Sequence, residues 1–287
     1  MIQLGEMQVH LINDHHIMVD PGGAFGLVPR ALWSPILPPD ENHLVPMVAT
    51  CLLVQHNGRN IVIDTGYGNK LPEKQKAFMQ MRRPDGDLLA GLARLGLTPE
   101  DIHHVIPTHL HYDHAGGLTR FAEDGETVVA TFPNAEYVVQ RREYEDAMRP
   151  NERTRATYLP FNYEPLVKSG QMHLLDGDTE IVSSVRGVVT RGHTPGHMSV
   201  ILESGGQHLM FVCDMASYAI HFERLGWMTG YDVEPLETLE SKRRWQKWAL
   251  ETNAILVFPH DSQRPIGRYV LGADGKGVVQ AINEPYV

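Results

Sequence analysis

The segment from Thr108 to His114 constrains the fold of this chain more than any other, because it places four potential metal ligands within six residues. It follows an apolar, strand-like stretch, and on an extended backbone His109 and His111 point to the same side. Asp113 and His114 follow where an Ala-Gly-Gly sequence keeps the turn sterically open. Nitrogen and oxygen ligands at this density suit a pair of divalent ions. The segment therefore predicts a strand that ends at a metal centre.

The composition agrees with a centre built from imidazole and carboxylate groups. The chain has 287 residues, with 16 histidines but only 2 cysteines. Cys51 and Cys213 lie far apart, each within an apolar run, which excludes a disulfide framework and a thiolate metal cluster.

Charge and hydropathy narrow the class of partner. The formal net charge is −10 and no basic run exceeds Lys242–Arg244, which argues against nucleic acid as a partner. The N-terminus lacks the basic region and long apolar stretch of a secretory signal. The longest apolar stretch, Met47–Val54, is far shorter than the ~20 residues that cross a bilayer. We therefore expect a soluble cytoplasmic protein that acts on a small molecule, with no membrane partner.

Strand and helix patterns along the chain predict an α/β protein. Helical spacing of apolar residues predicts helices over Asp87–Leu95 and Leu236–Glu251. No linker or repeat interrupts the chain, so we expect one domain over residues 1–287 with an irregular arm over residues 20–46, and sheets covered by helices. Runs rich in β-branched and apolar residues are expected to form strands: Val48–Val54, Asn60–Asp64, His104–Thr108, Glu136–Gln140, Val185–Arg191, Met198–Glu203, His208–Asp214 and Ala254–Pro259.

Three more potential ligands follow predicted strands, as His109 does: His197, Asp214 and His260. Loops at the carboxyl ends of strands build the sites of α/β folds. Each residue alone has an ordinary structural explanation, but together they indicate one shared site. His193, four residues before His197, is expected to be a turn residue or a donor that supports a ligand.

The potential ligands of the His109–His114 segment, followed by His197, Asp214 and His260, resemble in type and order the ligands of the dinuclear metallo-β-lactamase fold superfamily. Asp64, within Asp-Thr-Gly, resembles that superfamily's first motif, where the aspartate supports the metal-bound histidines. The resemblance implies an αββα sandwich, in which two mixed β-sheets are flanked by helices. It also implies two divalent ions, zinc or alternatively iron, manganese or cobalt. The ligands it assigns are His109, His111 and His197 for one ion, Asp113, His114 and His260 for the other, and Asp214 as the bridge.

Within the superfamily, several stretches resemble quorum-quenching lactonases of the YtnP-like branch, which open N-acyl-homoserine lactones. The resemblance implies that a hydroxide bridging the metals attacks the lactone, and homodimer formation is left open. We expect Asp113 to pass a proton to the leaving alkoxide, Tyr218 to donate a hydrogen bond to the carbonyl oxygen, and His221 to contact the substrate. The stretches concerned are residues 20–33, 97–102, 114–118, 131–135 and 227–232.

Other substrates are left open by the sequence. Organophosphate hydrolases of the methyl parathion hydrolase type share this architecture, and an ester or thioester hydrolase is a further alternative. Glutathione thioesters call for a basic patch, for which only Arg264 and Arg268 are available near the C-terminus. A scaffold protein without catalysis is the third alternative. A lactone with an acyl tail needs an apolar groove, and its candidate lining residues are Phe25, Leu27, Trp33, Trp227 and Met228.

Overall fold

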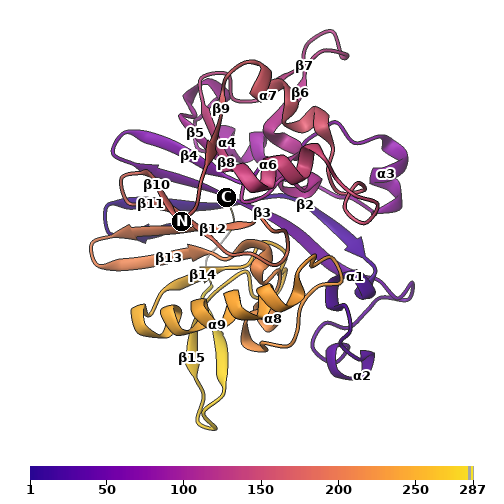
Figure 1. The fold of residues 1–287 in the computed structure, drawn as a ribbon, viewed down its shortest axis with the longest axis vertical. Coiled ribbons are helices and arrows are strands. Elements are labelled where there is room, and N and C mark those ends of the chain that lie inside the picture. The colour runs from indigo at the N-terminus through magenta and orange to yellow at the C-terminus, as the bar shows by residue number, and fades with distance from the viewer. Residues whose placement is uncertain (284–285, 287) are drawn as a thin grey trace.

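The computed structural model describes residues 1–283 and 286, and two seven-stranded mixed sheets form its centre (Figure 1). The first sheet has the order β1 (Ile2–Leu4), β2 (Met7–Val19), β3 (Val45–His56), β4 (Arg59–Ile63), β5 (His104–Ile106), β8 (Glu136–Gln140) and β9 (Met172–Leu175). The second has the order β10 (Thr179–Val182), β11 (Val185–Val189), β12 (Met198–Ser204), β13 (Gln207–Phe211), β14 (Ile255–Val257), β15 (Ile266–Leu271) and β16 (Gly277–Ala281). A separate hairpin pairs β6 (Thr119–Phe121) with β7 (Val128–Ala130).

The largest apolar cluster contains side chains from both sheets, so it forms the core between them. Leu52 and Ile63 of the first sheet belong to it together with Val200 and Phe211 of the second, and all four are almost fully buried. Residues of alternate strand positions reach this core, since successive side chains of a strand point to opposite faces. Removal of such apolar surface from water is the main favourable contribution to folding.

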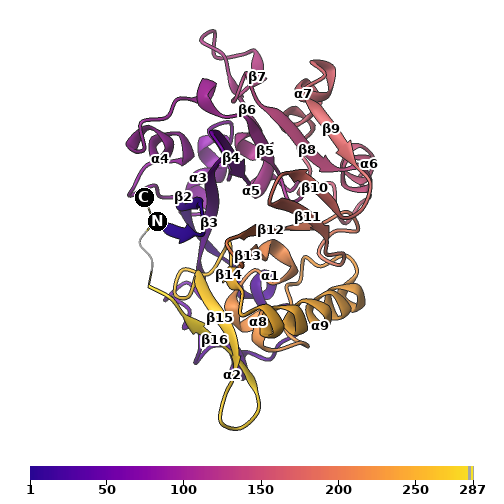
Figure 2. The same ribbon diagram turned by 90° about the vertical axis from the view of Figure 1, so that its left-hand side faces the viewer.

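Helices cover the outer faces of both sheets, as Figures 1 and 2 show. A second apolar cluster joins the first sheet to α4 and α7, and a third joins the second sheet to α8 and α9. This arrangement confirms the predicted αββα sandwich. The helices are α1 (Pro21–Phe25), α2 (Arg30–Trp33), α3 (Glu73–Phe78), α4 (Leu88–Arg94), α5 (Tyr112–Ala115), α6 (Arg141–Met148), α7 (Glu164–Lys168), α8 (Ala219–Glu223) and α9 (Pro235–Thr252), with 3-10 turns η1 (Pro99–Asp101), η2 (Gly116–Leu118), η3 (Pro160–Asn162) and η4 (Cys213–Met215).

The arm between β2 and β3 folds as two short helices with a small core of their own. The Asp20 carboxylate accepts a hydrogen bond from the Gly22 amide and caps α1. Phe25 and Trp33 stack with ring centres 5.1 Å apart and are buried in an apolar cluster that also contains Ile220 of α8. The arm is therefore anchored beside α8, close to the carboxyl end of β13.

Every predicted strand and both predicted helices are present, with ends displaced by a few residues. The long strand β2 was not predicted, because Asn13 to His16 interrupt its apolar pattern. There the pairing of β2 with β3 shifts register, and the side chain of Asp14 is buried.

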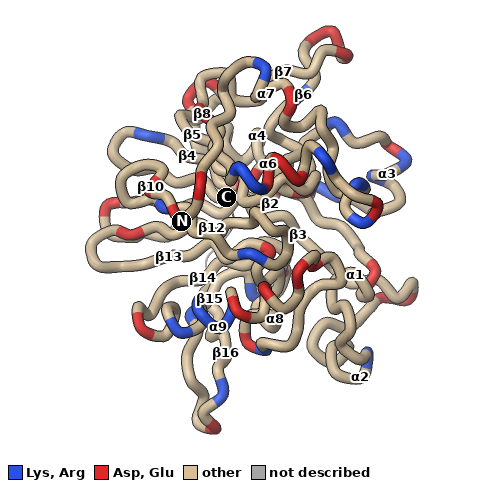
Figure 3. The backbone as a smooth tube through the Cα atoms, viewed as in Figure 1, with Lys and Arg blue, Asp and Glu red and all other residues tan. Residues whose placement is uncertain are grey.

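Both α6 and α9 carry acidic and basic side chains (Figure 3). Among the described residues, no helix combines the length and apolar character required to cross a membrane.

Candidate metal centre

The potential ligands converge at one edge of the sandwich, where strands of both sheets end. The first sheet contributes His109, just after β5, and α5 with Asp113 and His114. The second sheet contributes Asp214 in η4, just after β13, and His260 after β14. All five are buried or nearly so. Residues more than 150 positions apart in the chain therefore share one site, as the strand-end argument predicted.

The side-chain nitrogen and oxygen atoms that could bind a metal ion form two groups, each from three residues. In the first group, His109, His111 and His193, the ligand atoms lie within 4.8 Å of one another. The same limit holds for the second group, Asp113, His114 and His260.

The Asp214 carboxylate lies between the two groups. Its Oδ2 atom is 3.2 Å from Nε2 of His193 and 3.3 Å from Nε2 of His114. Its Oδ1 atom is 3.1 Å from Nε2 of His260. One carboxylate thus faces both groups, which is the position of a bridging ligand.

Hydrogen bonds from the surrounding protein hold the rings so that one nitrogen faces the cluster. Nδ1 of His114 lies 2.8 Å from the Asp64 carboxylate, and Nδ1 of His260 lies 2.7 Å from the carbonyl oxygen of Val48. Nε2 of His109 is buried without any hydrogen-bond partner. A buried polar atom without a partner is costly unless a ligand satisfies it. This orphaned nitrogen and the nitrogen and carboxylate donor set fit divalent metal ions.

The structure corrects the expectation for His197. Its Nδ1 is hydrogen-bonded to Thr190 Oγ1 at 2.8 Å, and its Nε2 accepts the backbone N–H of Asp214 at 3.1 Å. Both ring nitrogens are therefore engaged within the protein. His193 instead directs Nε2 into the cluster, 3.1 Å from Nδ1 of His111. In the structure it is therefore His193, and not the His197 that the resemblance had assigned, whose ring nitrogen faces the other potential ligands.

Burial and the charges of neighbouring side chains shift the pKa values of the potential ligands. Burial lowers the pKa of His109 well below its usual value, and neighbouring imidazoles lower it further. Burial alone would raise the pKa of Asp113 and of Asp214. The charges of His114 and His260 outweigh that effect and hold both carboxyl groups well below their usual range. The ionised carboxylates and the neutral His109 ring are in the forms that bind a metal ion. Burial would lower the pKa of His114, but the nearby carboxylates outweigh that effect and raise it, so a metal ion must displace the proton of this ring.

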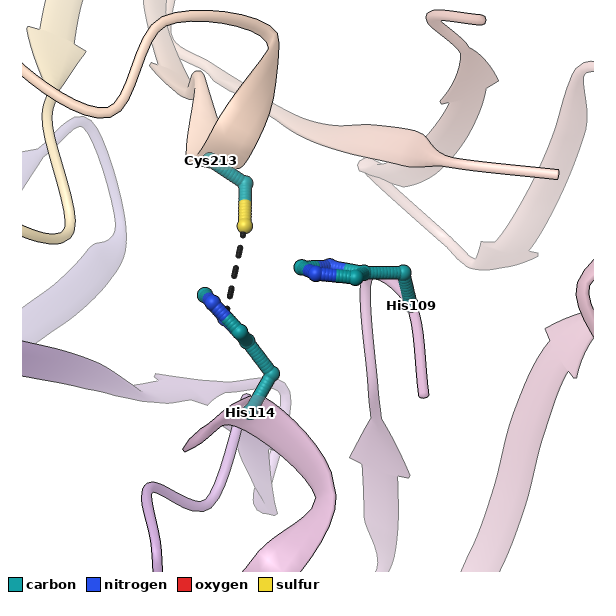
Figure 4. Close-up of side chains that lie close together, drawn as sticks. All are labelled: His109, His114 and Cys213. Carbon is teal, nitrogen blue, oxygen red and sulfur yellow. Dashed lines mark hydrogen bonds between the residues drawn. The ribbon is translucent and has the colours of Figure 1, made fainter. Parts of the chain in front are cut away.

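Cys213 points toward the ring of His114, and His109 lies beside both side chains (Figure 4). Its sulfur is 3.6 Å from Nδ1 of His114 and 3.3 Å from the Asp64 carboxylate, on the side of the ring away from Asp214. Burial raises the pKa of this thiol, so it stays protonated. Metal ions bind the thiolate, so this thiol is a poor ligand, although it lies close to His109 and His114. Its φ of 51° is left-handed, a strained conformation typical of functional sites.

An apolar cavity of about 390 Å³ opens directly onto the cluster. Asp113, Asp214 and His260 lie in its wall together with His111 and Tyr218. The rest of the lining is mainly apolar and comes from β2, the arm, β3, the end of α3 with the residue after it, and the segment before α9. It includes Ile17, Met18, Val19, Ala24, Leu44, Met47, Phe78, Met79 and Tyr231. A ligand with a polar head and an apolar tail matches this division.

Of the side chains expected to take part in catalysis, Tyr218 lines this cavity, as Asp113 does. Its hydroxyl lies 3.4 Å from the carbonyl oxygen of Pro46, a long contact that leaves the donor available. His221 does not line the cavity, contrary to expectation, because its ring is buried against Phe25 and Tyr218. Neither ring nitrogen of His221 has a hydrogen-bond partner.

The predicted apolar groove is present, but other residues form it. Phe25 and Trp33 belong to the core of the arm, and Leu27 is fully exposed. The sequence reasoning missed Met18 and Met79, because neither lies in a motif and the cavity arises only when β2 and α3 pack beside each other. It also left Asp232 unassigned, although the stretch 227–232 had stood out by resemblance.

Two packed mixed sheets, helices outside and a histidine and aspartate cluster at one edge define the class of αββα sandwich proteins, here with a candidate metal centre. The chain belongs to the metallo-beta-lactamase superfamily, whose sequence model matches residues 44–246. This match confirms the superfamily that the ligand motif had indicated.

Several proteins that this chain resembles are hydrolases. An N-acyl homoserine lactonase from Bacillus cereus is 28% identical over 236 residues, which cover 78% of this chain and 86% of the relative. A probable metal-dependent hydrolase from Staphylococcus aureus has a crystal structure with a TM-score of 0.89, 29% identity and full coverage of both chains. AidC, a dizinc quorum-quenching lactonase solved with a product, has a TM-score of 0.80 at 22% identity, covering 99% of this chain and 97% of the other. At that identity the likeness to AidC concerns the fold.

Proposed function

We propose that the protein is a metal-dependent hydrolase that opens the ring of N-acyl-homoserine lactones. The observation that carries this proposal is the pair of three-ligand groups around Asp214, placed at the end of an apolar cavity. The lactonase relatives support the same substrate class. Lactone opening adds water across the ester bond and yields a carboxylate and an alcohol, so the site must deliver one hydroxyl and one proton.

Two ions, in our proposal zinc, would be held by the two groups. His109, His111 and His193 would bind one ion, Asp113, His114 and His260 the other, and Asp214 both. Ions bound there would polarise the ester carbonyl and lower the pKa of water toward 7.

The chain's own side chains would manage the proton and the developing charge. Asp113 is ionised and lies in the cavity wall, so its free carboxylate oxygen can accept the proton of the attacking water and return it to the leaving alkoxide. Burial, with the nearby charges of Asp261 and Asp214, raises the pKa of Tyr218. Its phenol therefore keeps its proton and can donate to the carbonyl oxygen as negative charge grows there.

The apolar walls would bind the acyl tail. Met18, Met47 and Met79 lie on them, and methionine adapts its shape to different apolar groups. Basic side chains for a glutathione thioester are absent from the described lining of this cavity. Arg264 is hydrogen-bonded to Glu223, and Arg268 to the carbonyl oxygen of Asn253. These contacts favour a neutral ester with an apolar tail over a charged thioester.

A substrate panel tests the proposed reaction. The zinc-loaded protein should release one proton per lactone opened from acyl-homoserine lactones of increasing chain length, and a chelator should abolish this activity reversibly. Replacement of Asp113 by Asn should lower kcat by at least 100-fold, because the carboxylate is lost from the site. Turnover of a paraoxon-type phosphotriester without lactone turnover would instead support the organophosphate alternative.

A matched pair of variants tests the ligand set. His193→Gln and His197→Gln each replace one imidazole by a neutral amide, and only His193 directs a free nitrogen into the cluster. We expect His193→Gln to bind fewer than two zinc ions per chain and His197→Gln to keep two, as measured by elemental analysis. The opposite result would restore the assignment made from the sequence.

A further inference from the structure

The segment between α8 and α9 contains a buried carboxylate that the proposed reaction does not use. Asp232 is only 4% exposed. Its Oδ1 atom lies 3.0 Å from Nδ1 of His193 and 2.6 Å from the Thr229 hydroxyl. Its Oδ2 atom accepts the Thr238 hydroxyl at 2.8 Å. Each of these three partners can donate to the carboxylate, and one of them is the imidazole that faces Asp214.

The contact with Asp232 determines how His193 presents itself. A carboxylate accepts only, so the proton of a neutral His193 ring lies on Nδ1 and the lone pair lies on Nε2. Nε2 is the atom that faces Asp214 and His111. A carboxylate behind an imidazole fixes the tautomer and ring orientation and increases its basicity.

The backbone keeps Asp232 and His193 in register. The amide of Val233 donates to the carbonyl oxygen of His193 at 3.1 Å, and that of Glu234 donates to Gly192 at 2.8 Å. Gly192 has a φ of 137°, and a Cβ there would lie 2.1 Å from the Thr238 hydroxyl oxygen. The turn that contains His193 therefore packs closely against the start of α9, and Asp232 contacts both.

Each ligand group has one imidazole supported in this way. Asp64 lies behind His114 in the second group, and Asp232 lies behind His193 in the first. The other partners are neutral, namely the Thr108 hydroxyl for His109 and a backbone carbonyl for His260.

We propose that Asp232 is a positioning residue for the first metal group, which holds the His193 ring and its Nδ1 proton so that Nε2 faces the ion. This inference rests on the proposed function, because it requires His193 to be a ligand. The segment that includes Asp232 also places Tyr231 and Thr229 in the cavity wall. One stretch of chain therefore both forms part of the cavity wall and supports one metal group.

Asp232→Asn and Arg153→Gln form a matched pair for the test. The first keeps the size of the side chain and removes its charge. The second leaves the carboxylate in place, but removes the two hydrogen bonds that Arg153 donates to the carbonyl oxygens of Gly230 and Asp232. It therefore controls for loosening of the segment alone. Asp232→Ala, which loses all three contacts, is the more severe variant.

Zinc affinity, measured by competition with a chromophoric chelator, is the readout, together with the melting temperature of the metal-free protein. We expect Asp232→Asn to bind one of two zinc ions roughly 10- to 100-fold more weakly and the other as in the wild type. The metal-free melting temperature should stay within a few degrees, and Arg153→Gln should keep both affinities. The cobalt absorption spectrum of Asp232→Asn should change for one ion only.

Each outcome decides the matter. Wild-type affinity for both ions in Asp232→Asn would overturn the inference and leave the proposed function intact. Equal weakening in Asp232→Asn and Arg153→Gln would also overturn it, because the carboxylate would then serve only the segment's structure. A wild-type protein that binds no zinc would refute the proposed function and this inference with it.

Discussion

His221 should make the stability of the folded chain decrease at acidic pH, and a single substitution should remove this effect. Its ring is 1% exposed, and both nitrogens lack hydrogen-bond partners. Burial, with the charge of Lys242 nearby, lowers its pKa from 6.5 to about 3. The folded protein therefore holds this histidine neutral at pH values where the unfolded chain takes up a proton.

The sign and size of the effect follow from this difference. Below about pH 6.5 the unfolded state binds a proton that the folded state excludes, so stability falls as the pH falls toward 3. Between pH 7 and pH 5 this one group costs about 2 kcal/mol of unfolding free energy. His221→Leu removes the titrating group without removing a hydrogen bond, and the two side chains are similar in volume.

Urea unfolding at pH 7 and pH 5, with a chelator present so that metal release does not contribute, measures the effect. We expect His221→Leu to equal or exceed the wild type in stability at pH 7, and to lose about 2 kcal/mol less on acidification. His173→Leu, at an exposed position of β9, is the control and should follow the wild type. Equal losses in the wild type and His221→Leu would refute the reasoning that the ring is buried and neutral.

Three further predictions concern packing and burial. A Cβ at Gly196 would lie 2.2 Å from the backbone nitrogen of Glu143, so Gly196→Ala should lower the unfolding free energy in urea by about 2 kcal/mol or more. A Cβ at Gly23 would lie 2.1 Å from the Tyr231 hydroxyl at the end of a flexible side chain, so Gly23→Ala should alter KM for the lactone and change the melting temperature little. Burial lowers the pKa of Lys242 to about 8 from 10.5, and above pH 8 only the unfolded chain keeps the proton. The wild type should therefore gain up to about 3 kcal/mol over Lys242→Met between pH 8 and 10.5 in urea titrations.

Strand periodicity and strand-end residues are local signals, and they were sufficient to predict sheets covered by helices and the strand ends where the potential ligands lie. The arrangement of two sheets face to face came from the resemblance of the ligand motif to a known family. The sequence was insufficient to choose between His193 and His197. They lie in one turn, where no helical or strand period fixes the direction of a side chain. That choice depends on distant partners: Thr190 and the Asp214 amide engage one ring, and Asp232 engages the other.

The residues that line the cavity could not be predicted from local sequence patterns either. Phe25 and Trp33 are large and apolar, which the sequence equally associates with a binding groove or a core. Only the packing of the arm against α8 places them in a core and leaves Met18, Met47 and Met79 at the cavity.

Because the proposed ligands are divided between the two sheets, the stability of the folded chain should depend on the concentration of free metal. Each proposed ligand group takes side chains from both halves of the sandwich, so the halves cannot part without releasing the ions. A free ion at 100 times its Kd would add about 2.7 kcal/mol to the unfolding free energy. Proteases that attack the opened chain would then meet it about 100-fold less often when metal is plentiful. Scarcity of metal would therefore increase degradation of the protein as well as abolish its activity.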